Sequence, residues 1–185
     1  MTITSLSGES TGNYVLDTSR TRIGFVARHT MSTRVRGDFA EFEGGAYLDG
    51  ADPSKSEIRL TIRARSIRTG KTQRDEVLRS KFLDADNHPA LGFVSTGVER
   101  TGGNTFRVTG DLTVRGVTGP VTLDVTLTGT ASGTATGRPD DCRLAARGSA
   151  TIDRNVWGVN WNAMTSAMVS PKVTLDFEVV ALRRP

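Results

Sequence analysis

Few side chains in this sequence combine the residue type and the spacing that catalysis or metal binding requires. The two histidines, His29 and His88, are far apart and have no acidic or thiol neighbours at metal-ligand spacing. Cys142 is the single cysteine, so no internal disulfide can form, and it lies in an alternating run as a small buried thiol would. The sequence has neither a G-x-S-x-G elbow nor a glycine-rich phosphate loop ahead of a helix. We therefore predict no metal site, no required cofactor and no enzymatic activity; the alternative is an enzyme with an apolar reaction chamber.

His29 is the one titratable side chain that we expect on an inward face. It shares a strand face with Ile23, Phe25 and Ala27, while Arg28 lies on the other face. Two interpretations follow from this position. His29 is either a buried, hydrogen-bonded histidine or a polar anchor for a ligand head group near the mouth of a cavity.

Residues 155–168 hold both tryptophans and two methionines without strand alternation. Trp157, Trp161 and Met164 therefore belong either to a packed loop or to an adaptable apolar lid over a cavity mouth. Methionine suits a lid because its side chain is flexible and polarisable.

Strands must position these residues, because alternation of apolar and polar side chains dominates the chain. It is clear over residues 57–65, 106–115, 121–128 and 173–180, and weaker over residues 22–29, 35–42, 91–95 and 142–152. Successive strand side chains point to opposite faces, so each run has one apolar face. Turn signals separate the runs. We predict an all-β fold, an antiparallel lipocalin-like barrel of about eight strands, with a β-bulge near residues 40–41 that restores the phase between Phe39 and Phe42.

One segment breaks the strand pattern. Residues 71–82 have helical periodicity, with Val77, Leu78 and Phe82 on one face. Residues 86–89 end the run with a proline. We predict a short crossover helix that caps one end of the barrel.

The apolar members of the alternating runs must share the barrel interior, so we expect them to form the wall of a cavity. Small residues at Ala146 and Gly148 leave room for a channel along the strand from residue 142 to 152, with Trp157, Trp161 and Met164 near one end and His29 near a polar mouth. The other expected wall residues are Ile23, Phe25, Phe39, Phe42, Ile58, Leu60, Ile62, Phe82, Phe93, Leu112, Leu123, Val125, Leu144, Phe177 and Val179.

Length and charge limit the remaining classes. A chain of 185 residues fits one domain, which we place at residues 13–185 after a flexible tail of residues 1–12. The start of the chain lacks a basic and apolar leader, and no run is long and apolar enough for a transmembrane helix, so we expect a cytoplasmic protein without stable membrane insertion. The net charge of +4 comes from scattered arginines, and aromatics are only 6% of residues, so we expect no nucleic-acid partner.

Several motifs in order resemble those of the YceI-like family, bacterial lipocalin-like barrels that bind polyisoprenoids. The resemblance spans Tyr14 to Leu182. Its motifs are Tyr14–Asp17, Phe25–His29, Val35–Phe39, Ser66–Gly70, Leu78–Asp84 with His88–Ser95, Gly110–Val121, and Ile152–Arg154 with Trp157–Gly158. The resemblance implies a long apolar ligand inside the barrel (a polyisoprenoid, an isoprenoid quinone or a fatty-acid-like lipid), bound or carried by a homodimer.

The sequence departs from the family pattern at two places. Arg20-Thr21 stands where relatives often have a His-Ser pair, and Val77-Leu78 stands where the crossover helix often has His-Leu. If those histidines contact the head group in relatives, the head group bound here differs. Many relatives also carry a secretion signal, and we expect none here.

Overall fold

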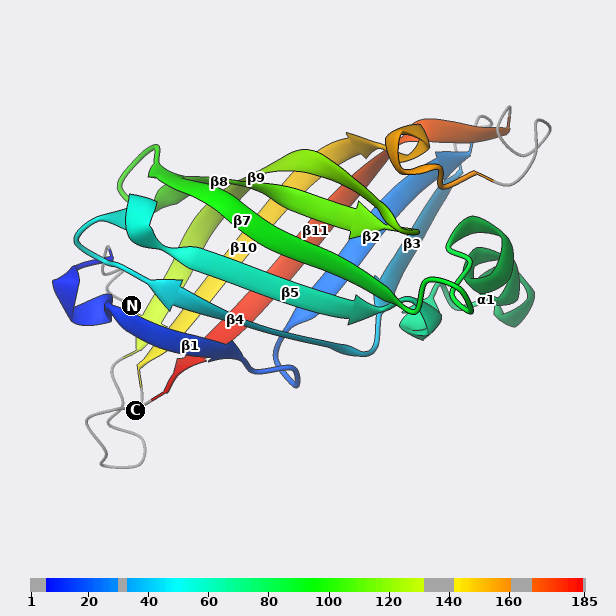
Figure 1. The fold of residues 1–185 in the computed structure, drawn as a ribbon. Helices are drawn as coiled ribbons and strands as arrows, with labels where there is room; N and C mark the ends of the chain where they lie inside the picture. The colour runs from blue at the N-terminus through cyan, green and yellow to red at the C-terminus, as the bar shows by residue number, and fades with distance from the viewer. Residues whose placement is uncertain (1–5, 30–32, 132–141, 161–167, 185) are drawn as a thin grey trace.

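A computed structural model describes residues 6–29, 33–131, 142–160 and 168–184, and it confirms the antiparallel barrel (Figure 1). The sheet runs in the order β1-β4-β5-β7-β8-β9-β10-β11, and pairing of β1 with β11 closes it. The strands are β1 (Gly12–Leu16), β2 (Arg22–His29), β3 (Arg34–Phe39), β4 (Phe42–Leu48), β5 (Glu57–Arg63), β6 (Ile67–Arg68), β7 (Ala90–Arg100), β8 (Thr105–Val114), β9 (Val117–Ala131), β10 (Arg143–Asp153) and β11 (Val169–Arg183).

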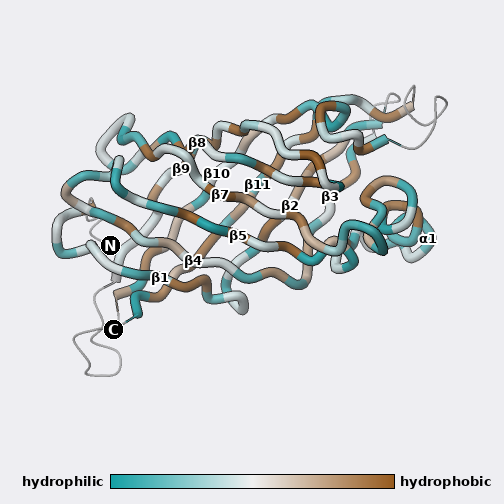
Figure 2. Tube along the Cα trace, in the orientation of Figure 1, coloured by the Kyte–Doolittle hydropathy of each residue, from teal (hydrophilic) through white to brown (hydrophobic). Residues whose placement is uncertain are grey.

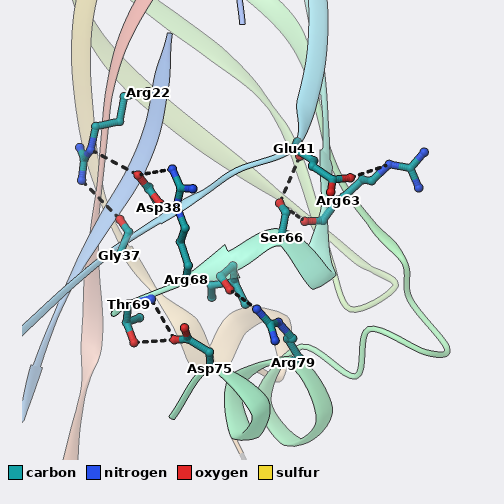
Figure 3. Close-up of polar contacts among 11 residues, drawn as sticks. Arg22, Gly37, Asp38, Glu41, Arg63, Ser66, Arg68, Thr69, Asp75 and Arg79 are labelled. Carbon is teal, nitrogen blue, oxygen red and sulfur yellow. Dashed lines mark hydrogen bonds and ion pairs between the residues drawn. The ribbon is translucent and has the colours of Figure 1, made fainter. Parts of the chain in front are cut away.

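Eleven strand segments fill eight positions of the barrel because three positions hold interrupted strands. The first position holds β1 and β2, which both pair with β11. The second holds β4, paired with β1, and β3, paired with β2. The third holds β5, paired with β4, and β6, paired with β3. Ser66, in the 3₁₀ turn η3 (Ala64–Ser66), joins two of the breaks, since its hydroxyl donates to the carbonyl of Glu41 at 3.2 Å (Figure 3). The chain therefore bends within a strand position without opening the barrel.

The break at residues 40–41 is where the sequence predicts a phase change. β3 ends at Phe39, β4 begins at Phe42, and the backbone N–H of Ala40 donates to the carbonyl of Ser66 at 3.0 Å. Phe42 lies directly opposite Ile62 in the ladder, so both side chains are on the inner face. The inward phase is thus restored after the break.

Hydrophobic and hydrophilic residues alternate along the strands (Figure 2), and burial follows this alternation. On β8, Phe106, Val108 and Leu112 are buried, whereas Arg107 and Asp111 are exposed. Burial of each such apolar side chain contributes about 1.5–3 kcal/mol. The pattern that predicts the strands is therefore also the one that builds the core.

Phenylalanine rings on the inner face lie over glycines of neighbouring strands. A Cβ atom at each of these glycines would overlap the ring that covers it. The pairs are Phe25 over Gly37, Phe93 over Gly110 and Phe177 over Gly148. Because glycine has no side chain, each ring can lie directly against the backbone of the neighbouring strand.

The expected helix is present at one end of the barrel. It consists of α1 (Thr72–Val77), continued by the π-helical turn η4 (Leu78–Phe82). Asp75 is buried and accepts hydrogen bonds from the backbone N–H and hydroxyl of Thr69 at 2.8 and 2.6 Å (Figure 3). Arg79 donates to the carbonyl of Arg65 at 2.8 Å. In the described part of the chain, no helix has both the length and the apolar character needed to cross a membrane.

Residues 6–11 precede β1 and contact the end of the barrel, and the flexibility expected of residues 1–12 stays a prediction. Residues 8–10 form the 3₁₀ turn η1 (Gly8–Ser10), and the Tyr14 hydroxyl donates to the carbonyl of Ser10 at 2.7 Å. Arg100 donates to the carbonyl of Leu6 at 3.0 Å, and Leu6 packs against the core. These contacts hold residues 6–12 against the end of the barrel opposite α1 (Figure 1).

Candidate ligand-binding cavity

The barrel interior is not filled by its own side chains. It encloses a cavity of about 570 Å³, to which every strand position of the barrel contributes. A barrel of about eight strands has an interior that side chains can just fill, or that can hold one small ligand. Here the flat Phe–Gly pairs and small residues such as Ala46 and Ala146 leave the centre open.

Most of the residues that the sequence predicts for the wall do line this cavity. They are Ile23, Phe25, His29, Phe39, Ile58, Leu60, Ile62, Phe82, Phe93, Leu112, Leu123, Val125, Leu144, Ala146, Trp157, Phe177 and Val179. Trp161 and Met164 lie outside the described residues.

Phe42 and Gly148 are not part of the lining. Phe42 is partly buried and packs against the hydrophobic core. Gly148 faces inward, but the ring of Phe177 covers it and occupies the room that a side chain there would take. The space expected beside Gly148 is therefore filled, because a neighbouring ring moves into the gap that a missing side chain leaves.

The cavity is apolar along its length, and three of its basic or titratable lining residues gather at the helix end. His29 is at the end of β2, Arg74 is on α1, and Arg154 begins the 3₁₀ turn η5 (Arg154–Trp157). His29 is half-buried, and its backbone N–H donates to the carbonyl of Thr33 at 2.8 Å. This end also contains Trp157, so His29 and Trp157 line the same end of the cavity.

Arg154 is the residue that the sequence analysis missed most clearly. Its side chain is 4% exposed, and its nitrogens donate to the carbonyls of Ser170, Val159 and Val169 at 3.1, 2.7 and 2.9 Å. Burial lowers the pKa of Arg154, and the nearby Asp153 opposes that shift. Because a guanidinium keeps its proton at neutral pH, Arg154 places a buried positive charge beside the cavity. Its position in the Ile152–Arg154 motif is the only sequence signal that marks it.

A second arginine connects the helix to the loop of Trp157. Arg115 lies at the β8–β9 turn, where its backbone φ is +52°. Its Nη1 atom is 3.2–3.3 Å from the carbonyls of Lys81, Phe82, Gly158 and Asn160. The Nη1 atom carries two hydrogens, so these four acceptors share them. The contacts join η4 to the loop after η5.

Trp157 lies at the same end of the cavity as His29 and Arg154. It is 3% exposed, and its indole N–H donates to the carbonyl of Leu112 at 2.8 Å. This hydrogen bond fixes the ring against β8, and Trp157 also lines the cavity. Within the described ranges, no cluster of three histidine, cysteine or carboxylate side chains could hold a metal ion.

A closed barrel with a helix over one end and an apolar cavity inside defines a lipocalin-like barrel protein. Sequence comparison identifies the family more narrowly: the YceI-like domain matches residues 14–181. A UPF0312 protein of Pseudomonas syringae pv. tomato is 31% identical over 167 residues, which cover 89% of this chain and 85% of that protein. The chain therefore belongs to the YceI-like family.

Solved structures show the same fold. BcnA of Burkholderia cenocepacia superposes with a TM-score of 0.79 at 24% identity, covering 89% of this chain and 98% of that one. A polyisoprenoid binding domain from Saccharophagus degradans, described as implicated in plant cell wall breakdown, superposes with a TM-score of 0.69 at 18% identity, covering 92% and 98%. At these identities the likeness supports the fold alone.

Proposed function

We propose that this protein binds or carries a long apolar molecule inside its barrel. The candidates are a polyisoprenoid, an isoprenoid quinone or a fatty-acid-like lipid. The main observation behind the proposal is the open, apolar cavity of about 570 Å³. Side chains could have filled a barrel of this size, but here they leave the centre open. The description of a structural neighbour as a polyisoprenoid binding domain supports the same class of ligand.

The driving force for binding is burial of the apolar chain. Each Å² of apolar surface removed from water contributes about 25 cal/mol, less the cost of ordering a flexible tail. Val77 lines the cavity at the position where relatives often have histidine, so the helix offers the ligand an apolar contact there. The basic groups of Arg74 and Arg154 lie at the same end and favour a polar or anionic head group.

Native mass spectrometry of the purified protein tests the proposal directly. We expect a co-purified species with the mass of a prenyl or acyl lipid, released when the protein unfolds. The protein is then delipidated and titrated with a long-chain prenyl alcohol. A protein that purifies empty and does not bind prenyl alcohols, prenyl quinones or fatty acids would refute the proposal.

Trp157 supplies a reporter for that titration because it borders the cavity and is buried. The chain has two tryptophans, so the Trp161→Phe variant isolates its signal. We expect saturable quenching or a spectral shift with a long-chain prenyl quinone, and none with a short prenyl alcohol at the same concentration. The proposal favours binding over catalysis, so the ligand should be recovered chemically unchanged.

A further inference from the structure

The outer face of the barrel carries a groove of basic residues that the proposed function does not use. The groove has a volume of about 420 Å³ and crosses β10, β11, β2 and β3. Its basic residues, called here the basic groove, are Arg28, Arg34, Arg36 and Lys172, and all four are exposed. The rest of its lining is Val26, Thr151, Ser170 and Thr174.

The described carboxylates near the basic groove do not form ion pairs with it. Across the described residues, none of its four basic side chains forms an ion pair. Asp153 lies directly opposite Lys172 in the ladder without pairing with it, and its carboxylate accepts a hydrogen bond from the backbone N–H of Asn155 at 2.9 Å.

Other basic residues on or beside these strands do have carboxylate partners. Asp38 accepts a hydrogen bond from Arg68 at 2.6 Å and lies 3.9 Å from Arg22 (Figure 3). Arg22 also lies 3.4 Å from Asp176. Arg22 and Arg68 are thus balanced by Asp38 and Asp176, whereas the four residues of the basic groove are not paired in this way.

The pairing of β2 with β3 brings like charges of the basic groove together, which lowers the stability of the fold. Arg28 and Arg34 lie directly opposite each other in the ladder, and Arg36 follows on the same face. Like charges in directly opposite positions destabilise a sheet. An anionic partner that binds at this position would offset that repulsion.

The basic groove borders the helix end of the cavity. Residues that alternate with the groove residues face inward, so that Val35 lies between Arg34 and Arg36, and His29 follows Arg28. The ends of β2 and β10 and the start of β11 all lie at the α1 end of the barrel (Figure 1). A surface that binds the basic groove would thus lie next to the end where η4 and Trp157 cover the cavity.

We propose that the basic groove docks the barrel on an anionic phospholipid surface, with the helix end beside the bilayer. The partner chemistry follows from the charge of the groove and, resting on the proposed function, from a ligand whose long apolar chain resides in membranes. A nucleic acid fits less well because none of the described residues that line the groove is an aromatic on which bases could stack. Contact is electrostatic and peripheral, so raised salt weakens it.

Vesicle flotation tests the docking surface. The full chain should float with vesicles of phosphatidylcholine and phosphatidylglycerol at low salt, and not with vesicles of phosphatidylcholine alone. The test variant is the triple substitution Arg28→Gln, Arg34→Gln and Arg36→Gln. At the contribution expected for each basic residue near an anionic membrane, it should bind about 100-fold more weakly. Because it removes a like-charge pair, it should fold at least as stably as the parent.

The matched control removes the same charge from the other end of the barrel, through Lys55→Gln, Arg107→Gln and Arg143→Gln. All three residues are exposed, and we expect this control to bind anionic vesicles within a few-fold of the parent. If both triple variants lost vesicle binding equally, net charge alone would explain the binding, and the assignment of the groove would be overturned. Binding to neutral vesicles, or displacement from anionic vesicles by a single-stranded RNA oligomer at low concentration, would also overturn it.

Failure of docking and failure of the proposed function are separable. Trp157 fluorescence reports prenyl quinone binding in detergent-free solution without vesicles, and the Arg28/Arg34/Arg36 variant should bind the quinone as the parent does. If quinone binding is absent while anionic vesicles still capture the parent through the basic groove, the cavity proposal fails and the docking surface stands. If quinone binding is intact while vesicles do not discriminate the triple variants, the docking proposal fails alone.

Discussion

At Gly148 the inner wall has no side chain of its own, and the ring of Phe177 covers the backbone instead. The neighbouring inward position, Ala146, does line the cavity. Gly148 and Ala146 differ by one methyl group, yet a ring covers Gly148 while Ala146 faces the cavity. Substitutions at the two positions should have different consequences.

Enlargement at Ala146 should block ligand binding and preserve the fold. In the Ala146→Trp variant the indole projects into the cavity, so we expect loss of prenyl quinone binding with a stability cost of about 1–3 kcal/mol from overpacking. Ser149→Trp is the control, because Ser149 is exposed on the same strand. Titration by fluorescence and denaturant unfolding measure the two effects. Unchanged affinity in a folded Ala146→Trp protein would place the ligand elsewhere.

A methyl group at Gly148 should act on stability. The added Cβ overlaps the Phe177 ring and lies 2.7 Å from the backbone carbonyl of Asp124, so the Gly148→Ala variant should be destabilised by about 1–3 kcal/mol. Gly92→Ala is a matched control on a barrel strand, because a Cβ atom added there meets nothing within 4 Å. Urea unfolding measures the stability of both variants. If Gly148→Ala were as stable as Gly92→Ala, the Phe177 ring would not constrain the wall.

Tyr14 makes stability depend on pH in the alkaline range. Burial, and then its contact with the Cys142 thiol at 3.6 Å, raise the pKa of Tyr14 above its usual value of about 10. Above that pH the unfolded tyrosine loses its proton while the folded one keeps it. The free energy of unfolding should therefore fall as pH rises, by up to about 1.4 kcal/mol per pH unit from this residue.

The Tyr14→Phe variant isolates this contribution, because every other titrating group is common to both proteins. We expect it to lose about 1 kcal/mol near neutral pH, through the missing hydrogen bond to Ser10. Between about pH 9 and about pH 11 its stability should fall less steeply than that of the parent. Parallel curves from denaturant unfolding across this range would contradict the assignment.

At the scale of elements, the helix end is held by contacts that a guanidinium makes with backbone carbonyls. Arg115 bridges η4 and the loop after η5, while Arg154 joins that loop to the start of β11. Neither contact belongs to a regular hydrogen-bond ladder. The π-helical geometry of η4, closed by the Leu83 N–H on the Leu78 carbonyl at 2.9 Å, adds a further irregular turn at this end.

Removal of the Arg115 guanidinium should loosen the helix end selectively. Arg115→Asn suits the test because asparagine tolerates the positive φ of this turn. We expect faster hydrogen exchange in η4 and around Gly158, faster ligand uptake and release, and unchanged protection of β8 and β9. Arg107→Asn, exposed on β8, is the control. Uniform loss of protection across the barrel would mean that Arg115 supports the whole fold.

At the scale of the whole molecule, an unfilled interior makes the apo protein less stable than a filled barrel, so ligand binding should raise stability. With ligand at about 100 times its dissociation constant the gain is about 2.7 kcal/mol, or roughly 5–10 °C in Tm for a domain of this size. Thermal unfolding with and without a long-chain prenyl quinone measures it. The Ala146→Trp variant should show no shift, and a shift as large as that of the parent would point to a site outside the cavity.

The expected homodimer and the expected cytoplasmic location stay predictions, because one described chain tests neither. Family membership, in contrast, is established over residues 14–181. It agrees with the motifs that the sequence presents in order, and the barrel that contains them is closed as expected.

The sequence alone determines the strands, the helix and most of the cavity wall. Alternation assigns one face of each strand to the interior, and this local rule correctly places residues such as Phe25, Leu112 and Val125 on the lining. The phase change near residues 40–41 is also readable, since a one-residue shift turns an apolar face outward.

Only the tertiary structure decides where space remains and which polar groups border it. Gly148 is inward by alternation, yet whether its space is empty depends on the rotamer of Phe177 on another strand. Arg154 and Arg115 follow no periodic pattern, and their roles depend on carbonyls from distant segments. The basic groove likewise assembles from β2, β3, β10 and β11. Periodicity reports the face of a single strand, whereas packing and charge balance depend on which strands are neighbours.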